Sequence, residues 1–275
     1  MKARSLIRRV LVAVILGPLV LALIWLGGYF TLAFVLIVVG VCVWEFHRLA
    51  LKKGAQGDLI ISELIAIAVC MAFYFNPNST IPLLIIGTLV VLFTELYRPK
   101  GSPLLSTSVT LFSGLYFSLL FGCFILIRQL PEKVGITYVE AGKWLILLII
   151  ATWVCDTAAY FFGSFFGKKK LMQRISPNKT IVGSVAGFIF GVLTAYVCHI
   201  AFIDELALFD SLMIGAIAGS FGQYGDLFES MFKRDADVKD SSSILPGHGG
   251  LMDRFDSLMI SGPVLYLYLR YIVFG

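Results

Sequence analysis

Acidic and basic side chains recur at helical spacing near the C-terminal end of the sequence. Asp226, Glu229 and Lys233 follow an i, i+3, i+7 pattern, which predicts that they share one face of a helix. Asp253 and Asp256 show i, i+3 spacing a short way downstream. Carboxylates from two helix ends, accompanied by lysine and arginine, are typical of a site that binds a hard cation together with phosphate groups.

Mg²⁺ prefers oxygen ligands, and proteins usually hold it through one or two carboxylates together with substrate phosphates. The leading candidate ligands are Asp226 and Asp253, with Glu229 and Asp256 as further ligands or as residues that support them. A simpler explanation stays open for part of this cluster. Acidic residues also suit the first turn of a helix because of its dipole, which would account for one of Asp253 and Asp256 but not for the whole cluster.

The segment from Ser230 to Ser257, "SMFKRDADVKDSSSILPGHGGLMDRFDS", is charged although both of its flanks are apolar. Within it, Gly249 and Gly250 belong to "PGHGG", where glycine would let backbone N–H groups come close to an anion. The alternative interpretation of "PGHGG" is a simple turn before a helix.

A second polar stretch, "GKKKLMQRISPNKTIVGS", begins at Gly167. Its Ser176, Lys179 and Thr180 are candidates for contacts with nucleotide phosphates, although its first lysines also fit ordinary charge at a membrane surface. Asp156 lies about three turns before those lysines, where it either serves a polar site or makes a buried structural hydrogen bond. The run "GSFFGKKK" lacks the glycine spacing of a P-loop.

The elements that must position these residues are apolar. The chain has 275 residues, of which 59% are hydrophobic and 14% charged, whereas a soluble domain has about a quarter charged residues. A polytopic, all-α integral membrane protein is therefore expected, with a single membrane domain over residues 1–275. Nine stretches approach the roughly 20 apolar residues that a span needs; they are 8–26, 30–47, 59–75, 81–97, 108–128, 144–166, 181–202, 208–228 and 258–274.

Two further features qualify this arrangement. Glu45, Glu63 and Glu95 lie near the ends of predicted spans, where a carboxylate either reaches the interface or serves a polar interior. The five cysteines all lie in apolar runs and are interpreted as small packing residues.

The basic residues predict the orientation of the spans. Of the 22 lysine and arginine residues, most lie in one alternating set of loops. Because such loops face the cytoplasm, the N-terminus and the two large polar loops, 167–180 and 229–257, are expected there. The protein is expected to be a multi-pass protein of the plasma (inner) membrane with its site facing the cytoplasm.

These residues resemble the signature of a known family. Ser230-Met-Phe-Lys-Arg, then Lys239-Asp240 four residues on, then Pro246 to Asp256, "PGHGGLMDRFD", is similar to the signature of phosphatidate cytidylyltransferases, also called CDP-diacylglycerol synthases. More than a dozen specified positions agree. The resemblance is specific over residues 145–275, which carry the catalytic signature and the polar loops.

The resemblance implies transfer of the cytidylyl group of CTP to phosphatidate in phospholipid biosynthesis, with Mg²⁺ required. It also implies nine transmembrane helices and a homodimer; no nucleic-acid partner is expected, and whether a monovalent cation joins Mg²⁺ stays open. The residues that we expect to take part in catalysis are Asp226, Lys233, Arg234, Lys239, Asp240, His248, Asp253 and Arg254. His248 would donate a hydrogen bond to phosphate rather than carry a proton.

Two other functions would fit part of this pattern. A related CTP-using membrane enzyme, such as another lipid cytidylyltransferase or a polyprenol kinase, would share much of this chemistry. An ion-coupled transporter would also place carboxylates in a membrane, but transporters usually show inverted repeats and broken helices, and neither is evident in the sequence.

Overall fold

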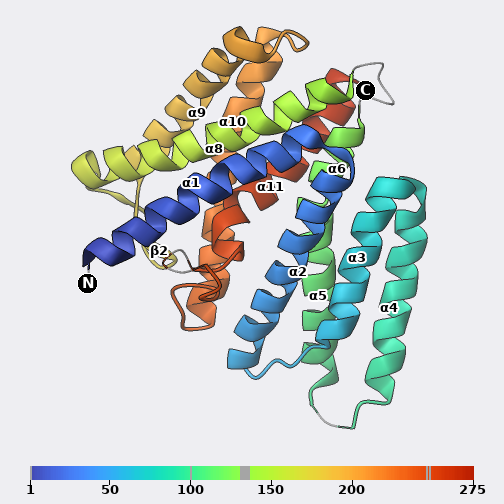
Figure 1. Ribbon diagram of the computed structural model, residues 1–275. Coiled ribbons are helices and arrows are strands. Elements are labelled where there is room, and N and C mark those ends of the chain that lie inside the picture. Colours follow the sequence, from blue (N-terminus) through green and yellow to red (C-terminus); the bar gives the residue numbers. More distant parts are fainter. Residues whose placement is uncertain (1, 100, 131–136, 246, 248) are drawn as a thin grey trace. The chain divides into compact units, whose positions relative to one another are not determined.

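The structure is a computed structural model that describes residues 2–99, 101–130, 137–245, 247 and 249–275. It is almost entirely helical, as expected (Figure 1). The helices are α1 (Lys2–Leu26), α2 (Gly28–Lys52), α3 (Leu59–Phe75), the short η1 (Pro77–Ser79), α4 (Thr80–Leu96), α5 (Pro103–Phe121), α6 (Cys123–Gln129), α8 (Tyr138–Phe166), α9 (Ile181–Phe202), α10 (Leu208–Asp235), α11 (Met252–Tyr268) and the π-helical η2 (Leu269–Val273).

The residues group into two compact units. Unit 1 contains residues 1–126 and 235–254, and unit 2 contains residues 127–234 and 255–275. The signature segment is therefore divided between them, since its first residues, 230–234, and its last, 255–257, belong to unit 2. A single membrane domain over the whole chain stays a prediction.

Unit 1 is built around α2, α3 and α5, which contact one another, while α1 packs on α2 and α4 packs on α3 and α5 (Figure 1). Gly27 and Gly28 separate α1 from α2, and both have positive φ, 68° and 51°. Glycine adopts these angles without a steric cost, so the chain can reverse here without a longer loop.

Unit 2 depends on close helix contacts at glycine. Gly183, Gly187 and Gly191 recur at every fourth position of α9, a spacing that lets helix backbones approach each other in membranes. A Cβ on Gly187 would lie 2.9 Å from the carbonyl oxygen of Cys155 on α8, and one on Gly191 would lie 3.1 Å from that of Gly215 on α10. These contacts position α10, which carries several of the expected site residues.

Five described helical segments are long and apolar enough to cross a membrane: Gly28–Lys52, Pro77–Leu96, Pro103–Gln129, Tyr138–Phe166 and Ile181–Phe202. Shorter apolar helices occupy Val14–Leu26 and Leu59–Phe75. The protein is an all-α integral membrane protein. The predicted spans lie almost entirely on described helical residues, although 108–128 covers both α5 and α6 and 258–274 covers both α11 and η2; the count of nine and the orientation stay predictions. All five cysteines are free and buried, as their interpretation as packing residues requires.

The loop expected at residues 167–180 contains a short β-hairpin. Strand β1 (Lys170–Met172) pairs antiparallel with β2 (Ser176–Thr180), with Lys170 opposite Thr180 and Met172 opposite Ser176. The last residue of β2 is also the N-cap of α9, because the hydroxyl of Thr180 accepts a hydrogen bond from the amide of Gly183 at 3.2 Å. The hairpin thus leads directly into α9.

Candidate active site

Three carboxylates of unit 2 form a compact cluster. Asp226 and Glu229 lie one turn apart on α10, and Asp256 lies on α11. One oxygen from each of the three lies within 4.8 Å of the others. The two helices can come this close because residue 225 is a glycine; a Cβ there would collide with the carbonyl oxygen of Asp256. Glu229 is buried, and the other two are half-buried.

Two lysines accompany this cluster. Lys179 Nζ lies 2.7 Å from Asp226 Oδ2, and Lys233 Nζ lies 2.5 Å from Glu229 Oε2. The hydroxyl of Ser230 donates to Asp226 Oδ1 at 3.2 Å, and the amide of Ser257 donates to Asp256 Oδ1 at 2.6 Å. Carboxylates and lysines thus alternate around one small volume, which suits a cation and phosphate groups together.

The electrostatics of the cluster favour a cation. Asp256 precedes the apolar part of α11, which begins at Leu258. Burial, and then the negative charges of Asp226 and Asp156, raise the pKa of Asp256 well above its ordinary value. A divalent ion would relieve this repulsion, and three oxygen donors match the ligands that Mg²⁺ prefers. The residues present therefore fit the metal that the sequence predicts.

The hairpin brings Lys179 to the cluster, although 47 residues separate it from Asp226. Lys179 also donates to the carbonyl oxygen of Gln223 at 3.4 Å. Arg234 ties the end of α10 to the hairpin, since its Nε donates to the carbonyl oxygen of Ile175 at 3.3 Å. Thr180 is buried and caps α9, and Ser176 is half-buried. Contacts of Ser176, Lys179 and Thr180 with substrate stay predictions.

Asp253 lies in unit 1. Its carboxylate organises the signature loop, by which we mean residues 241–245, 247 and 249–252. Its Oδ2 accepts hydrogen bonds from the amide of Ser241 at 2.9 Å and the amide of Gly250 at 2.8 Å, and it lies 2.9 Å from the hydroxyl of Ser241, which is equally close to Glu45 Oε2. Gly249 has φ +81°, and a Cβ there would lie 2.7 Å from Asp253 Oδ2. One glycine amide, that of Gly250, does reach an anion, and that anion is the side chain of Asp253. A cation shared by Asp253 and Asp226 stays a prediction.

The remaining expected site residues divide by place and exposure. Lys239, Asp240 and Arg254 are exposed in unit 1, and Asp156 is exposed on α8 in unit 2. His248 lies outside the described residues. The catalytic roles of these residues stay predictions.

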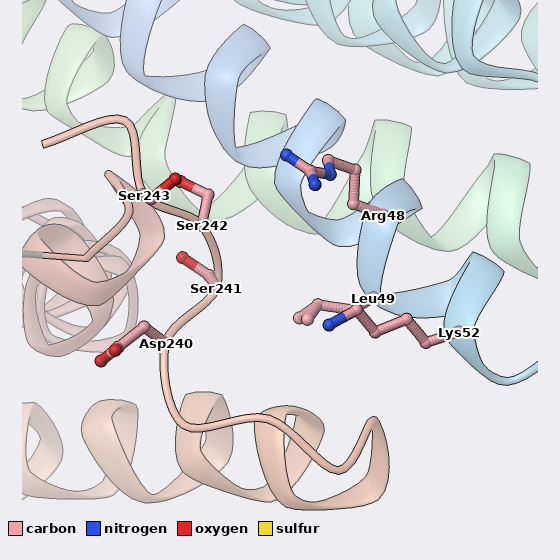
Figure 2. Close-up of a pocket in the computed structure, with 7 residues that line it drawn as sticks. All are labelled: Arg48, Leu49, Lys52, Asp240, Ser241, Ser242 and Ser243. Atoms are coloured by element: carbon pink, nitrogen blue, oxygen red, sulfur yellow. The ribbon is translucent and has the colours of Figure 1, made fainter.

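Sequence reasoning did not assign a role to α2, yet α2 supplies residues beside the signature loop. Arg48, Leu49 and Lys52 line a cavity of about 220 Å³ together with residues 240–243. Figure 2 shows the α2 side chains on one side of this cavity and the loop serines on the other. Buried Glu45, one turn before Arg48, accepts hydrogen bonds from the loop. The signal that could have pointed to it is a carboxylate directly after a long apolar run of the helix.

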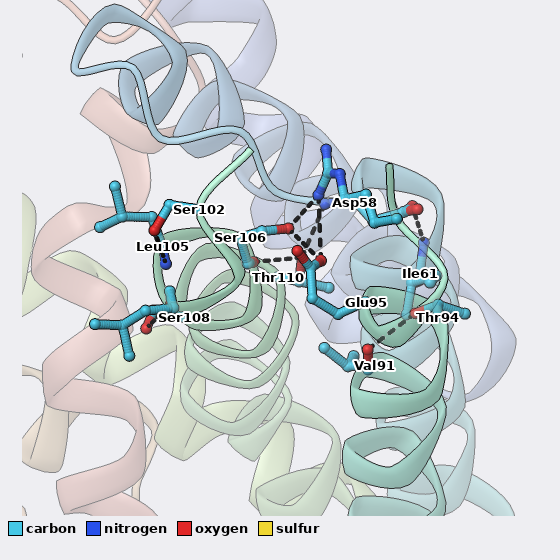
Figure 3. Close-up of polar contacts among 12 residues, drawn as sticks. Asp58, Ile61, Val91, Thr94, Glu95, Ser102, Leu105, Ser106, Ser108 and Thr110 are labelled. Carbon is cyan, nitrogen blue, oxygen red and sulfur yellow. Dashed lines mark hydrogen bonds and ion pairs between the residues drawn. The ribbon is translucent and has the colours of Figure 1, made fainter. Parts of the chain in front are cut away.

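A second polar cluster of unit 1 joins α3, α4 and α5 (Figure 3). Ser106 donates to Glu95 Oε2 at 2.7 Å, and Arg98 lies 3.4 Å from the same oxygen. Asp58 caps α3 through the amide of Ile61, and its own amide donates to Thr110. These bonds satisfy Glu95 within the protein and join the ends of neighbouring helices.

Comparison with known proteins identifies the family. A family model described as the cytidylyltransferase family matches residues 7–272. The chain therefore belongs to the cytidylyltransferase family, and the resemblance read from the signature is confirmed.

Three curated relatives carry the name phosphatidate cytidylyltransferase. The phosphatidate cytidylyltransferase of Staphylococcus saprophyticus is 42% identical over 168 residues, which cover 59% of this chain and 64% of the relative. That of Bacillus subtilis is 40% identical over 157 residues, covering 57% and 56%. That of Staphylococcus aureus (strain COL) is 32% identical over 266 residues, covering 95% and 98%. The chain thus matches less than two thirds of the length of the first two relatives.

Proposed function

We propose that this protein transfers the cytidylyl group of CTP to phosphatidate, giving CDP-diacylglycerol and pyrophosphate. The single observation that carries the proposal is the cluster of Asp226, Glu229 and Asp256 with Lys179 and Lys233. Lys233 and Asp256 of this cluster belong to the signature that the family shares. The relatives named phosphatidate cytidylyltransferase support the same substrates.

In this reaction a phosphate oxygen of phosphatidate attacks the α-phosphorus of CTP. A bond forms between these two atoms, and the bond from the α-phosphorus to the bridging oxygen of the β-phosphate breaks, so pyrophosphate leaves. A phosphate monoester has a second pKa of about 6, so the nucleophile is already largely ionised at neutral pH. Catalysis then depends on alignment and on offsetting negative charge rather than on a strong base.

Residues of this chain can be assigned to metal binding and to phosphate binding in this reaction. Asp226, Glu229 and Asp256 would hold Mg²⁺, with Asp253 as a fourth candidate ligand. Bound there, Mg²⁺ would offset the charge of the phosphates and favour in-line displacement. Lys179, Lys233 and Arg234 would bind phosphate oxygens from unit 2, while His248 would donate a hydrogen bond to phosphate.

Further parts of the proposal concern placement. The protein would be a multi-pass protein of the plasma (inner) membrane, with nine spans, a cytoplasmic N-terminus and a site that faces the cytoplasm. It would act as a homodimer. The uneven distribution of lysine and arginine supports the orientation.

The test uses the purified full-length protein in lipid nanodiscs with phosphatidate, Mg²⁺ and CTP that is labelled either at the α- or at the γ-phosphate. We expect the α-label to appear in lipid and the γ-label in pyrophosphate. Transfer of the γ-label to a polyprenol would instead support a kinase. Label in no lipid, with folded protein and with a range of lipid acceptors, would overturn the proposal.

A further inference from the structure

Glu45 is a carboxylate in a place where burial is costly. It lies on α2, between apolar neighbours, and its side chain has no exposed surface. A buried charge needs hydrogen bonds that replace its lost hydration. The hydrogen-bond partners of Glu45 therefore indicate its role.

Among the described residues, four donors surround the Glu45 carboxylate, and they come from the signature loop. The amide of Leu251 donates to Oε1 at 2.9 Å, and the amide of Met252 donates to Oε2 at 2.8 Å. The hydroxyl of Ser242 donates to Oε1 at 2.5 Å, and the hydroxyl of Ser241 lies 2.9 Å from Oε2 and shares its one hydrogen between Glu45 and Asp253. Each carboxylate oxygen thus faces one backbone and one hydroxyl donor from a segment about 200 residues away.

The two amides lie at the start of α11, whose first residue is Met252. The first N–H groups of a helix have no partner within the helix, and a negative charge near them is favourable. Glu45 therefore acts as an N-terminal cap that is supplied by another helix. It differs from an ordinary cap because it also holds the two serines that precede the helix.

Gly250 shows how closely the loop is fitted around this carboxylate. A Cβ at residue 250 would collide with Glu45 Oε1 and with the hydroxyl of Ser241. The amide of Gly250 meanwhile donates to Asp253, and so does the amide of Ser241. Glu45 and Asp253 therefore hold the same short loop from its two sides.

We propose that Glu45 is a positioning residue for the reaction: its carboxylate fixes the conformation of the described part of the signature loop, residues 241–245, 247 and 249–252, and with it the start of α11. The inference rests on the proposed function only for its effect on turnover. Arg48 and Lys52 follow Glu45 at i+3 and i+7, so the same face of α2 presents two cations to the cavity that the loop serines line.

The experiment compares wild-type protein with Glu45→Gln in nanodiscs by amide hydrogen exchange and by CDP-lipid formation. Glutamine keeps the size of the side chain but replaces one acceptor oxygen with a donor NH₂ group, which cannot accept from an amide. We expect exchange at Leu251 and Met252 to rise by about tenfold or more, the size expected for losing a hydrogen bond to a charged group. Turnover should fall by a similar factor, with exchange in α8 and α9 unchanged.

Glu95→Gln is the matched control, because Glu95 also accepts from a serine hydroxyl but contacts α5 instead of the loop. It should leave exchange at Leu251 and Met252 unchanged. Unaltered loop exchange in Glu45→Gln, or a rise spread evenly over both units, would overturn the proposal. If Glu45→Gln does not fold, Ser242→Ala removes one donor only; no rise in loop exchange there would count equally against it. If the wild-type protein forms no CDP-lipid, the proposed function is contradicted. The role of Glu45 in holding the loop is still tested, because the exchange comparison needs no substrate.

Discussion

Lys179 Nζ lies 2.7 Å from Asp226 Oδ2, so a basic residue of the β-hairpin pairs with a candidate metal ligand on α10. Neither side chain is fully buried; the lysine is 25% and the aspartate 34% exposed. A cation that binds Asp226 has to share that carboxylate with the ammonium group. If the proposed roles of Lys179 and Asp226 hold, the pair links phosphate binding by the hairpin to metal binding by the helix.

Lys179→Met should have two opposite effects on the reaction. Turnover should fall because a phosphate contact is lost, while less Mg²⁺ should be needed for half activity because a competing cation is gone. The shift should be about two- to fivefold, since partly exposed ion pairs contribute about 0.2–1 kcal/mol. Initial rates measured against Mg²⁺ check both effects. Lys170→Met, an exposed lysine of the same hairpin, should change neither, and a raised Mg²⁺ requirement in Lys179→Met would contradict the pairing.

Asp226→Asn and Asp256→Asn should each reduce turnover by orders of magnitude and raise the Mg²⁺ concentration needed for half activity. The double variant should be little worse than either single one, because residues that act as one unit are strongly non-additive. Rates against Mg²⁺ for purified, folded protein provide the measurement.

Asp237→Asn is the control for these variants. Asp237 is exposed and pairs with Lys53 at the surface, and its φ of 55° is one that asparagine tolerates. Asp237→Asn should leave turnover and the Mg²⁺ requirement nearly unchanged. Asp253→Asn in the same assay tests the predicted cation shared with Asp226. A raised Mg²⁺ requirement would support the shared cation. Reduced turnover with an unchanged Mg²⁺ requirement would mean that Asp253 stabilises the signature loop without binding the metal.

Two glycines of α10 should respond oppositely to alanine. At Gly225 a Cβ would collide with the backbone of α11, whereas at Gly222 the nearest atom would be 3.6 Å away, an ordinary contact. Gly225→Ala should destabilise the protein by about 1–3 kcal/mol and separate Asp226 from Asp256. Gly222→Ala should be neutral or stabilising, since alanine favours helix by about 1 kcal/mol. Thermal unfolding in detergent measures both, and equal losses would contradict the close approach of the helices.

His248→Gln should retain part of the activity. The attacking phosphate is largely ionised at neutral pH, so a hydrogen-bond donor suffices and an amide can replace the imidazole. The dependence of rate on pH should keep its shape. Complete loss of activity in folded protein that still binds CTP would assign His248 a proton-transfer role instead.

Asn78→Cys and Ser243→Cys should be labelled from opposite sides of the membrane. Both positions are exposed, and the five native cysteines are buried, so background labelling with a membrane-impermeant reagent should be low. The expectation follows from the distribution of basic residues. Labelling from the same side would exclude the nine-span arrangement.

The sequence predicted the helical character of the chain well, because long apolar runs leave few alternatives in a membrane. The i, i+3 spacing of Asp226 and Glu229 is a local property, and the structure indeed has them on one face of α10. The juxtaposition of Asp256 with both depends on Gly225 and on the packing of α11, which no local pattern specifies. The hairpin at residues 170–180 was missed because its strands are only three and five residues long.

Glu45 shows the same limit more sharply. Glu45, Glu63 and Glu95 looked alike in the sequence, each being a carboxylate near the end of an apolar run. Their partners come from distant segments, and only the folded chain distinguishes the carboxylate that reaches the signature loop from the one that reaches Ser106. Asp253 likewise showed the spacing of a metal ligand, while its bonds to Ser241 and Gly250 could not be read from spacing.

The capping of α11 by a residue of α2 limits how far the signature of this protein can be treated as a separate module. A fragment or chimaera that keeps residues 127–275 preserves every residue of the signature and loses the carboxylate that receives Leu251 and Met252. Such a protein would still contain the family motif, but its signature loop would lack the carboxylate of Glu45. Transplanting the catalytic half therefore requires a donor helix that offers a glutamate at the position of Glu45.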